Sequence, residues 1–315
     1  MDGNATGRRA ALGCMAWAGA GLLWRVQGGV PRATLLGSAE AAGAGGGLAF
    51  VQVSDSHLGF ANPPNPDPAG TYREAMALVR AGRGDAALML HTGDVSHLSR
   101  EPEFDVAWQI AGEAGLETHY VPGEHDVLVE EGRGFFARFT PRSALGAEPG
   151  RARGWYAFDQ GGVHFVGLNN VQDLRPGGMG RLGAEQLAWL RDDLAGRAAS
   201  QPVVVFAHVP LWTVHAPWGW GTDDAAEALA LLRRFGSVTV LNGHIHQVMQ
   251  KVEGQCAFHT ARSTAFPQPA PGAAASPGPV RDVPPGRLRA LLGITRVAEV
   301  RGESPLAVID TPLGA

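Results

Sequence analysis

Residues 48–57 read LAFVQVSDSH, a mostly apolar run followed by Ser-Asp-Ser-His. The apolar part predicts a strand that is buried on both faces. Two further runs predict strands: residues 86–90 end at His91-Thr92-Gly93-Asp94, and residues 118–121 end at Pro122-Gly123. Helical patterns at residues 71–80 and 104–114 separate the three runs. This alternation is typical of parallel βαβ units and predicts an α/β fold.

The rest of the chain adds more strands than helices. Further helices are expected at residues 182–194 and 225–234, and further strands at residues 155–158, 163–168, 203–206, 238–241, 294–300 and 306–309. Gly161-Gly162 lies between two of these strands and favours a hairpin turn. Residues 267–285 are rich in Gly, Pro and Ala and predict a surface loop. About 30 residues follow that loop, too few for an independent core, so the last strands should return to the main sheet.

The N-terminal residues carry the pattern of an export signal. Arg8-Arg9 precede a weakly apolar run from Ala10 to Trp24, and Ala39-Glu40-Ala41 provides small residues for cleavage. The run is shorter than the roughly 20 apolar residues of a membrane span. The pattern resembles a twin-arginine signal. The alternative is a disordered or uncleaved N-terminal anchor.

This interpretation divides the chain into an export signal (residues 1–41), a flexible lead-in (42–47) and one domain (48–315). The expected location is the bacterial periplasm, with no stable membrane span in the mature chain. Removal of the signal takes four of the 26 basic and two of the 30 acidic residues, so the formal charge falls from -4 to -6. This acidity argues against nucleic acid as a partner. Cys14 would leave with the signal, so Cys256 could form no intramolecular disulfide.

Five short motifs hold carboxylate or imidazole side chains, and each follows an expected strand. They are Asp55-Ser56-His57, Gly93-Asp94, Gly123-Glu124-His125-Asp126, Ala207-His208-Val209-Pro210 and Gly243-His244-Ile245-His246. Side chains at the carboxyl ends of strands in an open α/β sheet meet at one edge. Five of the 11 histidines fall in these motifs. A single Asp-x-His or Gly-Asp would indicate only a turn with a capping aspartate, whereas all five motifs together predict a metal site.

In this order the motifs resemble those of the calcineurin-like metallophosphoesterases, over residues 50–246 and more weakly beyond. The resemblance implies a four-layer α/β/β/α sandwich of two mixed sheets flanked by helices. It also implies hydrolysis of phosphoesters by a hydroxide that bridges two metal ions, with His125 as general acid. The implied ligands are Asp55, His57 and His246 for the first metal, His208 and His244 for the second, and Asp94 as the bridge.

Glu124 departs from the family pattern, which usually has Asn before the catalytic histidine. As a ligand it would bring three carboxylates against the four charges of two divalent ions, for a net charge of +1 rather than +2. That charge weakens the attraction for an anionic substrate and favours a harder ion such as Mn²⁺ or trivalent iron. Alternatively, Glu124 turns aside to bind backbone or an arginine, leaving a poorer second site. The expected cofactors are two divalent ions, drawn from Mn, Fe and Zn.

The run Gly-His-Ile-His-Gln at residues 243–247 looks most like the cyclic-nucleotide phosphodiesterase branch of the family. We therefore expect a phosphodiesterase with a small-molecule phosphoester as its substrate. Export would suit periplasmic nucleotides, 2′,3′-cyclic nucleotides or phospholipid head groups. The alternatives are a phosphomonoesterase of nucleotides or sugars, and a non-catalytic binding scaffold of the same fold, against which His125 argues. The sequence carries no signal for an oligomeric state.

Residues beside the motifs are expected to support them. His91 and His97 flank the Asp94 turn and are assigned orienting or surface roles. Asp126 is expected to cap a turn. The tryptophan-rich loop at residues 212–220 either forms an apolar wall over the metals or packs to shield the sheet edge. Two histidine ligands in Gly-His-Ile-His require a bend, which Gly243 would permit.

Overall fold

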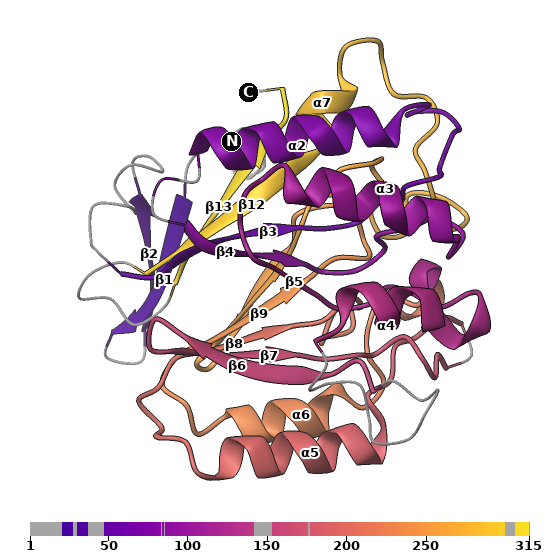
Figure 1. Ribbon diagram of the computed structural model, residues 1–315. Helices are drawn as coiled ribbons and strands as arrows, with labels where there is room; N and C mark the ends of the chain where they lie inside the picture. The colour runs from indigo at the N-terminus through magenta and orange to yellow at the C-terminus, as the bar shows by residue number, and fades with distance from the viewer. Residues whose placement is uncertain are drawn as a thin grey trace, which may run out of the picture.

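The computed structural model describes residues 21–27, 30–36, 47–82, 84, 86–141, 153–175, 177–299 and 306–314. Two β-sheets lie face to face between two layers of helices (Figure 1). This is the predicted four-layer α/β/β/α sandwich. One sheet has the strand order β13-β12-β3-β4-β5, and the other has the order β10-β11-β9-β8-β7-β6.

The five-stranded sheet begins with the strand quoted above. Its strands are β3 (Ala49–Val53), β4 (Ala86–His91), β5 (Thr118–Tyr120), β12 (Gly293–Ala298) and β13 (Ala307–Pro312). β3, β4 and β5 are parallel, whereas β12 joins β3 in antiparallel fashion, so the last two strands return to the main sheet as predicted. The helices α2 (Pro68–Gly82), α3 (Glu101–Gly112) and α4 (Arg133–Phe139) cover its outer face.

The six-stranded sheet is parallel in its centre and antiparallel at both edges. Its strands are β6 (Tyr156–Gln160), β7 (Val163–Gly167), β8 (Val203–Phe206), β9 (Val238–Asn242), β10 (Gln250–Glu253) and β11 (Cys256–Thr260). Between β6 and β7, Gly161 and Gly162 have φ of 56° and 82°, which confirms the predicted hairpin turn. The helices α5 (Gly183–Ala195) and α6 (Ala225–Leu232) cover the outer face.

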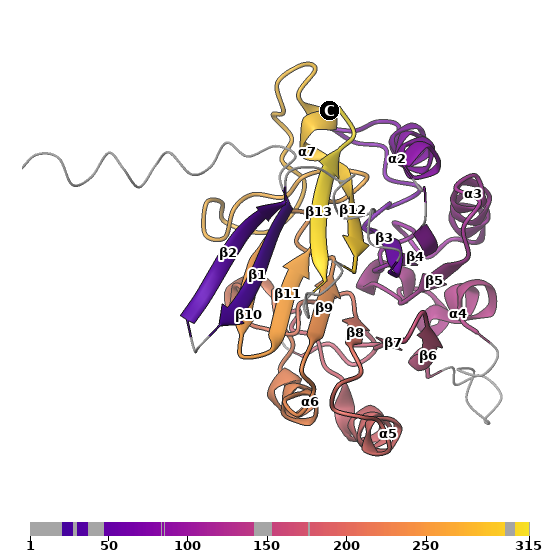
Figure 2. The ribbon, with the colours of Figure 1, turned by 90° about the vertical axis from the view of Figure 1, so that its left-hand side faces the viewer.

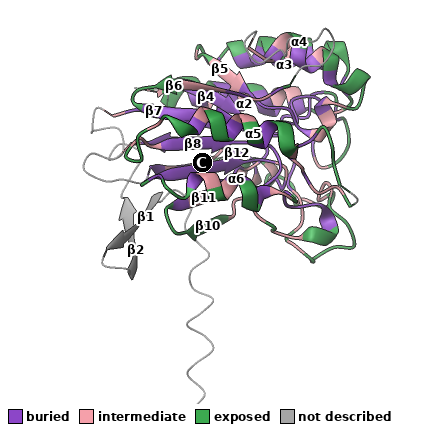
Figure 3. Cartoon of the chain, turned by 90° about the horizontal axis from the view of Figure 1, so that it is seen from below, coloured by how far each residue is buried: buried purple, intermediate pink, exposed green. Residues whose placement is uncertain are grey.

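An apolar layer joins the two sheets. Phe50 of β3 packs edge-on against Phe165 of β7, with ring centroids 5.2 Å apart, and Phe206 lies in the same fully buried cluster. Burial of each such ring contributes about 1.5–3 kcal/mol. The central strands are buried, whereas the edge strand β10 and the outer sides of the helices are exposed (Figure 3). Because the central strands are covered on both faces, the polar residues that follow them are held at a rigid sheet edge.

Several short elements have no counterpart in the prediction. They are α4, β10, α7 (Leu288–Leu291), and the one-turn 3₁₀ helices η1 (Glu124–Asp126), η2 (Glu130–Gly132) and η4 (Ala216–Trp218). Residues 267–285 hold no helix or strand and form the expected loop. None of the helices in the described part of the chain has the length and apolar content needed to span a membrane.

A separate antiparallel hairpin, β1 (Gly21–Gln27) and β2 (Val30–Leu36), lies next to β13 (Figure 2). It was not predicted and falls within residues 1–41, the expected export signal. The rest of that segment, including Arg8-Arg9 and Cys14, lies outside the described residues. The signal therefore stays a prediction.

Candidate metal centre

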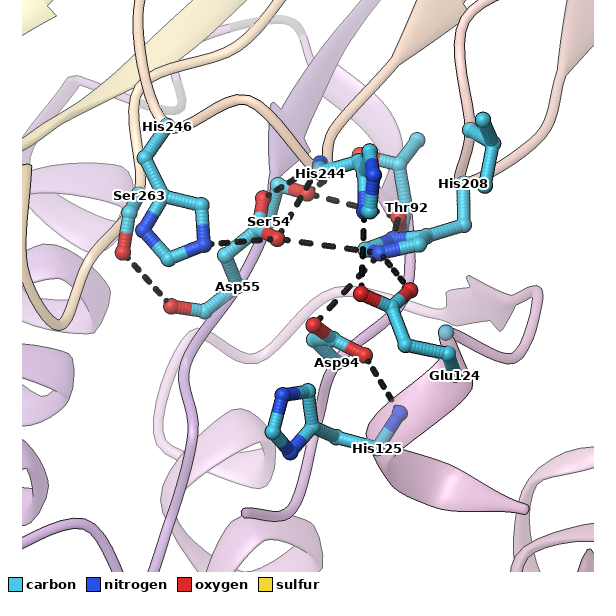
Figure 4. A network of polar contacts seen from close by, with 12 residues as sticks. Ser54, Asp55, Thr92, Asp94, Glu124, His125, His208, His244, His246 and Ser263 are labelled. Atoms are coloured by element: carbon cyan, nitrogen blue, oxygen red, sulfur yellow. Dashed lines mark hydrogen bonds and ion pairs between the residues drawn. The ribbon is translucent and has the colours of Figure 1, made fainter. Parts of the chain in front are cut away.

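The predicted ligands meet where the central strands end (Figure 4). Asp55 and His57 follow β3, Asp94 follows β4, and His246 follows β9. His57 Nε2 lies 3.3 Å from Asp94 Oδ2 and 3.2 Å from His246 Nε2. His246 Nε2 in turn lies 3.2 Å from Asp55 Oδ1. One ligand atom from each of these four residues falls within 4.8 Å of the other three, which matches the set expected for the first metal.

A second group forms around Glu124. Its carboxylate oxygens lie 2.9 Å from His208 Nε2 and 3.0 Å from His244 Nδ1. Glu124 thus turns into the site rather than toward an arginine or the backbone. Asp94 Oδ2 lies 3.5 Å from His208 Nε2 as well as 3.3 Å from His57 Nε2. Asp94 therefore faces both groups, as a bridging carboxylate would.

Buried ligand atoms in the second group fit a cation. Glu124 Oε2, His208 Nε2 and both ring nitrogens of His244 are buried and make no well-aligned hydrogen bond; the close partners of Glu124 are the ion-pair contacts with His208 and His244. Buried polar atoms are usually satisfied by hydrogen bonds, so several imidazole and carboxylate atoms that converge without one fit a bound cation. Imidazole and carboxylate are ligands that Zn, Mn and Fe ions accept. The residues present therefore fit the two-metal site implied by the sequence.

Backbone carbonyls set the orientation of three of the rings. His208 Nδ1 donates to Thr92 O at 2.7 Å, and His246 Nδ1 donates to Phe266 O at 2.6 Å. His125 Nδ1 donates to His97 O at 2.7 Å. A carbonyl only accepts, so Nδ1 carries a proton in each ring, and Nε2 is the atom left to hold a metal ion or a second proton. For His208 and His246, Nε2 is the atom that faces the carboxylates.

The electrostatics of the cluster favour positive charge. Burial would raise the pKa of Glu124, but His244 and His208 hold this pKa well below its ordinary value. Burial would lower the pKa of His208, but Asp94 and Glu124 raise it well above its ordinary value. The buried carboxylates therefore stabilise a cation at this point, either a proton on His208 or a metal ion.

Five of the seven predicted ligands have a left-handed backbone. The φ values are 53° for Asp55, 40° for His57, 52° for Asp94, 70° for His244 and 54° for His246. This region is uncommon for residues other than glycine, and it is sustained only where the surrounding structure enforces it. Such strain is typical of functional sites.

The bend in Gly-His-Ile-His lies at His244 and His246, and Gly243 permits it by leaving room rather than by its own φ. The left-handed residues are His244 and His246 themselves, while Gly243 lies outside this region. What Gly243 provides is space, because a Cβ there would lie 2.0 Å from Ser54 Oγ and 2.7 Å from Asp55 Oδ2.

His125 is placed beside the ligands as a proton donor would be. Its backbone N–H donates to Asp94 Oδ1 at 3.0 Å, and its Nδ1 is held by the carbonyl of His97. Burial would lower the pKa of His125, but the charges of Asp94 and Glu124 raise it. A raised pKa keeps the ring protonated closer to neutral pH, and Nε2 is the atom left for proton transfer.

The loops beneath the ligands are tightly packed. Trp218 and Trp220 are buried and pack against Ile245, the buried residue between two predicted ligands. Asn242 was not singled out from the sequence, yet its side-chain N–H groups donate to the carbonyls of Ala207 and Val209, on either side of His208. A polar residue at the end of a strand gives no sequence signal for this role.

Comparisons with known proteins agree with this geometry. The family profile described as Calcineurin-like phosphoesterase matches residues 48–248, which contain all five motifs. The chain is 26% identical over 229 residues to a probable cyclic nucleotide phosphodiesterase of Rhodopseudomonas palustris, covering 69% of this chain and 78% of that protein. It is 23% identical over 226 residues to a 3′,5′-cyclic-nucleotide phosphodiesterase of Nostoc sp., covering 70% and 79% respectively. The crystal structure of a dimetal phosphatase from Danio rerio shares the fold, with a TM-score of 0.63 and 14% identity over 84% of this chain and 96% of that one.

Proposed function

The chain belongs to the calcineurin-like phosphoesterase family, and from this premise we propose that it is a two-metal phosphodiesterase. The observation that carries the proposal is the position of Asp94 between two groups of converging ligand atoms. The buried nitrogens and oxygen of the second group that lack a well-aligned hydrogen bond support it.

The residues divide into two ligand sets and an acid. The first ion would be held by Asp55, His57, Asp94 and His246, and the second by Asp94, Glu124, His208 and His244. Two such ions supply Lewis acidity and an activated water when bound. His125 gives the proton from Nε2 to the leaving oxygen, while the Asp94 carboxylate orients the His125 backbone. Mn, Fe and Zn are the candidate metals, and Glu124 favours the harder of them at the second position.

The charges of the site favour a diester over a monoester. With Asp55, Asp94 and Glu124 ionised, two divalent ions would leave a net charge of +1. Across the ranges that the structure describes, no lysine or arginine forms an ion pair with these three carboxylates. A phosphomonoester dianion would carry more negative charge than this net charge balances, whereas a diester carries a single negative charge. Since two relatives are named for cyclic nucleotides, we propose cyclic phosphodiesters of nucleosides as the substrate class.

Metal reconstitution followed by a substrate comparison tests the function. Chelator-stripped protein is loaded with Mn, Fe or Zn, its metal content is measured by elemental analysis, and turnover is compared on bis-p-nitrophenyl phosphate and p-nitrophenyl phosphate. We expect two ions per chain and faster turnover of the diester. His125→Ala should reduce turnover by about 10²–10⁴ with the metal content unchanged. Protein that binds fewer than two ions, or that prefers the monoester, would contradict the proposal.

We also propose that the protein is exported. The twin arginines and the small residues before position 42 support this, and a folded, metal-loaded enzyme suits the twin-arginine route. Residues 1–41 fused to a reporter that is scored by its location should carry the reporter out of the cytoplasm. Replacement of Arg8 and Arg9 by lysine should retain it inside. Export that persists in the double variant would reject the twin-arginine route.

A further inference from the structure

His97 contacts two rings of the site at once. Its Nδ1 lies 3.3 Å from His57 Nδ1. Its ring stacks on that of His125, with centroids 4.8 Å apart and planes 15° apart. Its carbonyl accepts the 2.7 Å hydrogen bond from His125 Nδ1. One residue thus contacts both a proposed metal ligand and the proposed acid.

The contact with His57 differs from those that orient His208 and His246. Backbone carbonyls accept the Nδ1 hydrogen bonds of those two rings. His57 faces Asp94 Oδ2 with Nε2, which leaves Nδ1 as its outward donor. The atom positioned to accept from it is Nδ1 of His97, in a side chain. Of these three ligand rings, His57 is therefore the one whose acceptor a substitution can remove.

His97 is itself firmly held. Its backbone N–H donates to the carbonyl of Leu58 at 2.9 Å. Its ring meets the edge of Phe60, with centroids 5.2 Å apart and planes at 85°. Phe60 is buried and packs on Phe266, whose carbonyl orients His246. The acceptor for His57 therefore belongs to the same packed unit as the rest of the first ligand set.

We propose that His97 is a positioning residue that orients His57 toward the first ion and His125 toward the leaving group. The inference rests on the proposed phosphodiesterase function, since it assigns a role within that site. Loss of a group that hydrogen-bonds a ligating histidine typically weakens metal binding by about 10–100-fold. His97 acts through the two rings rather than on the substrate, so it is not a catalytic residue.

Two substitutions separate the contacts. His97→Asn places an oxygen on the carbon that carries Nδ1, so it keeps an acceptor for His57 and removes the ring that stacks on His125. His97→Phe keeps a ring and removes the acceptor. The Phe variant should bind Mn²⁺ about 10–100-fold more weakly at one of its two sites, measured by calorimetric titration of chelator-stripped protein. The Asn variant should bind both ions as the wild type does.

The Asn variant should instead show weaker acid catalysis. Proton donation matters most when the leaving group is a poor one. Across bis-aryl phosphates whose leaving phenols differ in pKa, the turnover number of the Asn variant should fall more steeply with leaving-group pKa than that of the wild type. A general loss of structure would lower all rates alike and would not change this dependence.

His119 provides a matched control, because its ring stacks on Phe158, with centroids 3.9 Å apart, outside the site. His119→Asn should retain wild-type metal affinity and leaving-group dependence. Wild-type behaviour in both His97 variants would overturn the positioning role. So would parallel losses of metal affinity and thermal stability in both variants with no change in leaving-group dependence. A wild-type protein that binds no metal would reject the proposed function and this inference together, whereas an active, metal-loaded wild type with unaffected variants rejects the inference alone.

Discussion

Asp126 holds Ser96 by two hydrogen bonds, one from the Ser96 backbone N–H at 2.8 Å and one from its hydroxyl at 2.9 Å. The same buried carboxylate accepts from the backbone N–H groups of Val95 and Gly123, each at 3.0 Å. The predicted capping role of Asp126 is thus confirmed, and Asp126 also accepts hydrogen bonds from a second turn. It joins the turn that carries Asp94 to the turn that carries Glu124 and His125.

Asp126→Ala should therefore destabilise the fold and the site together. It leaves three buried backbone N–H groups without their acceptor, at a cost of about 1–3 kcal/mol each. We expect the free energy of unfolding to fall by at least about 3 kcal/mol, measured by urea denaturation.

Asp105→Ala is the control for this change. Asp105 is an exposed carboxylate whose partner is Arg138, and its loss should cost less than about 1 kcal/mol. Equal effects from the two variants would contradict the assigned role of Asp126.

The central strands could be predicted because they depend on local apolar patterns, whereas the ligand roles were implied by the resemblance to the family and stay a prediction. Val203–Phe206 is continuously apolar, and His208 comes two residues after its end, so the strand and the candidate ligand are visible together. The edge strand β10 was not predicted, because Gln250–Glu253 is exposed along its whole length and has no apolar face. The helix α4 is short, contains Gly134 and has no side-chain cap at its start, so its pattern was too weak to identify.

The parts of the site that could not be predicted depend on contacts between residues that are far apart in the sequence. The left-handed φ of His244 and His246 has no signature in their residue types, since either residue usually avoids that region. The bonds from Val95 and Ser96 to Asp126 cross about 30 residues and exist only after β4 and β5 have paired. Similarly, no spacing rule predicts that the ring of His97 contacts His57, 40 residues away along the chain.

Glu124→Gln tests whether the charge of this side chain holds the second ion. The substitution keeps the length of the side chain and removes the negative charge that faces His208 and His244. Loss of a residue that only hydrogen-bonds a metal ligand weakens metal binding by about 10–100-fold. Glu124 is proposed to bind the ion itself, so one of the two ions should bind at least about 10-fold more weakly. Elemental analysis after dialysis should then give about one ion per chain rather than two.

Glu113→Gln controls for loss of a carboxylate outside the site, because Glu113 pairs with Arg73 on the surface. Two retained ions and unchanged turnover in Glu124→Gln would show that the charge of Glu124 is irrelevant to the centre.

His91 should make the stability of the metal-free protein depend on pH. Burial lowers the pKa of His91 to about 3, from an ordinary value of 6.5. As the pH falls, the unfolded chain binds a proton at His91 at a higher pH than the folded chain does. The contribution of neutral His91 to the free energy of unfolding is therefore complete above pH 6.5 and is lost as the pH falls toward 3. The slope is about 1.4 kcal/mol per pH unit within that window.

His91→Gln removes this titration while keeping a donor for Ser56, whose hydroxyl lies 3.1 Å from His91 Nε2. Urea unfolding of both chelator-treated proteins between pH 4 and 7 gives the comparison. The free energy of unfolding of the wild type should fall more steeply with decreasing pH. If the free energy of unfolding fell equally with decreasing pH in both proteins, His91 would have the same pKa in the folded and unfolded states.

Gly243→Ala tests the close approach on which the first ligand set depends. An added Cβ would lie 2.0 Å from Ser54 Oγ and 2.7 Å from Asp55 Oδ2, so the Asp55 turn and the His244 turn must separate. His244 N–H donates to Asp55 Oδ1 at 3.1 Å, and that bond should lengthen or break. A shift of about 1 Å in reacting or binding groups can cost about 10²-fold in rate, so we expect a loss of that order with bis-p-nitrophenyl phosphate.

Gly112→Ala is the matched control. No heavy atom lies within 4 Å of its added Cβ, and alanine in a helix is up to about 1 kcal/mol more favourable than glycine. The Gly112→Ala variant should be fully active and at least as stable as the wild type. If Gly243→Ala were equally active, the Asp55 turn and the His244 turn would not be as tightly packed as these distances require.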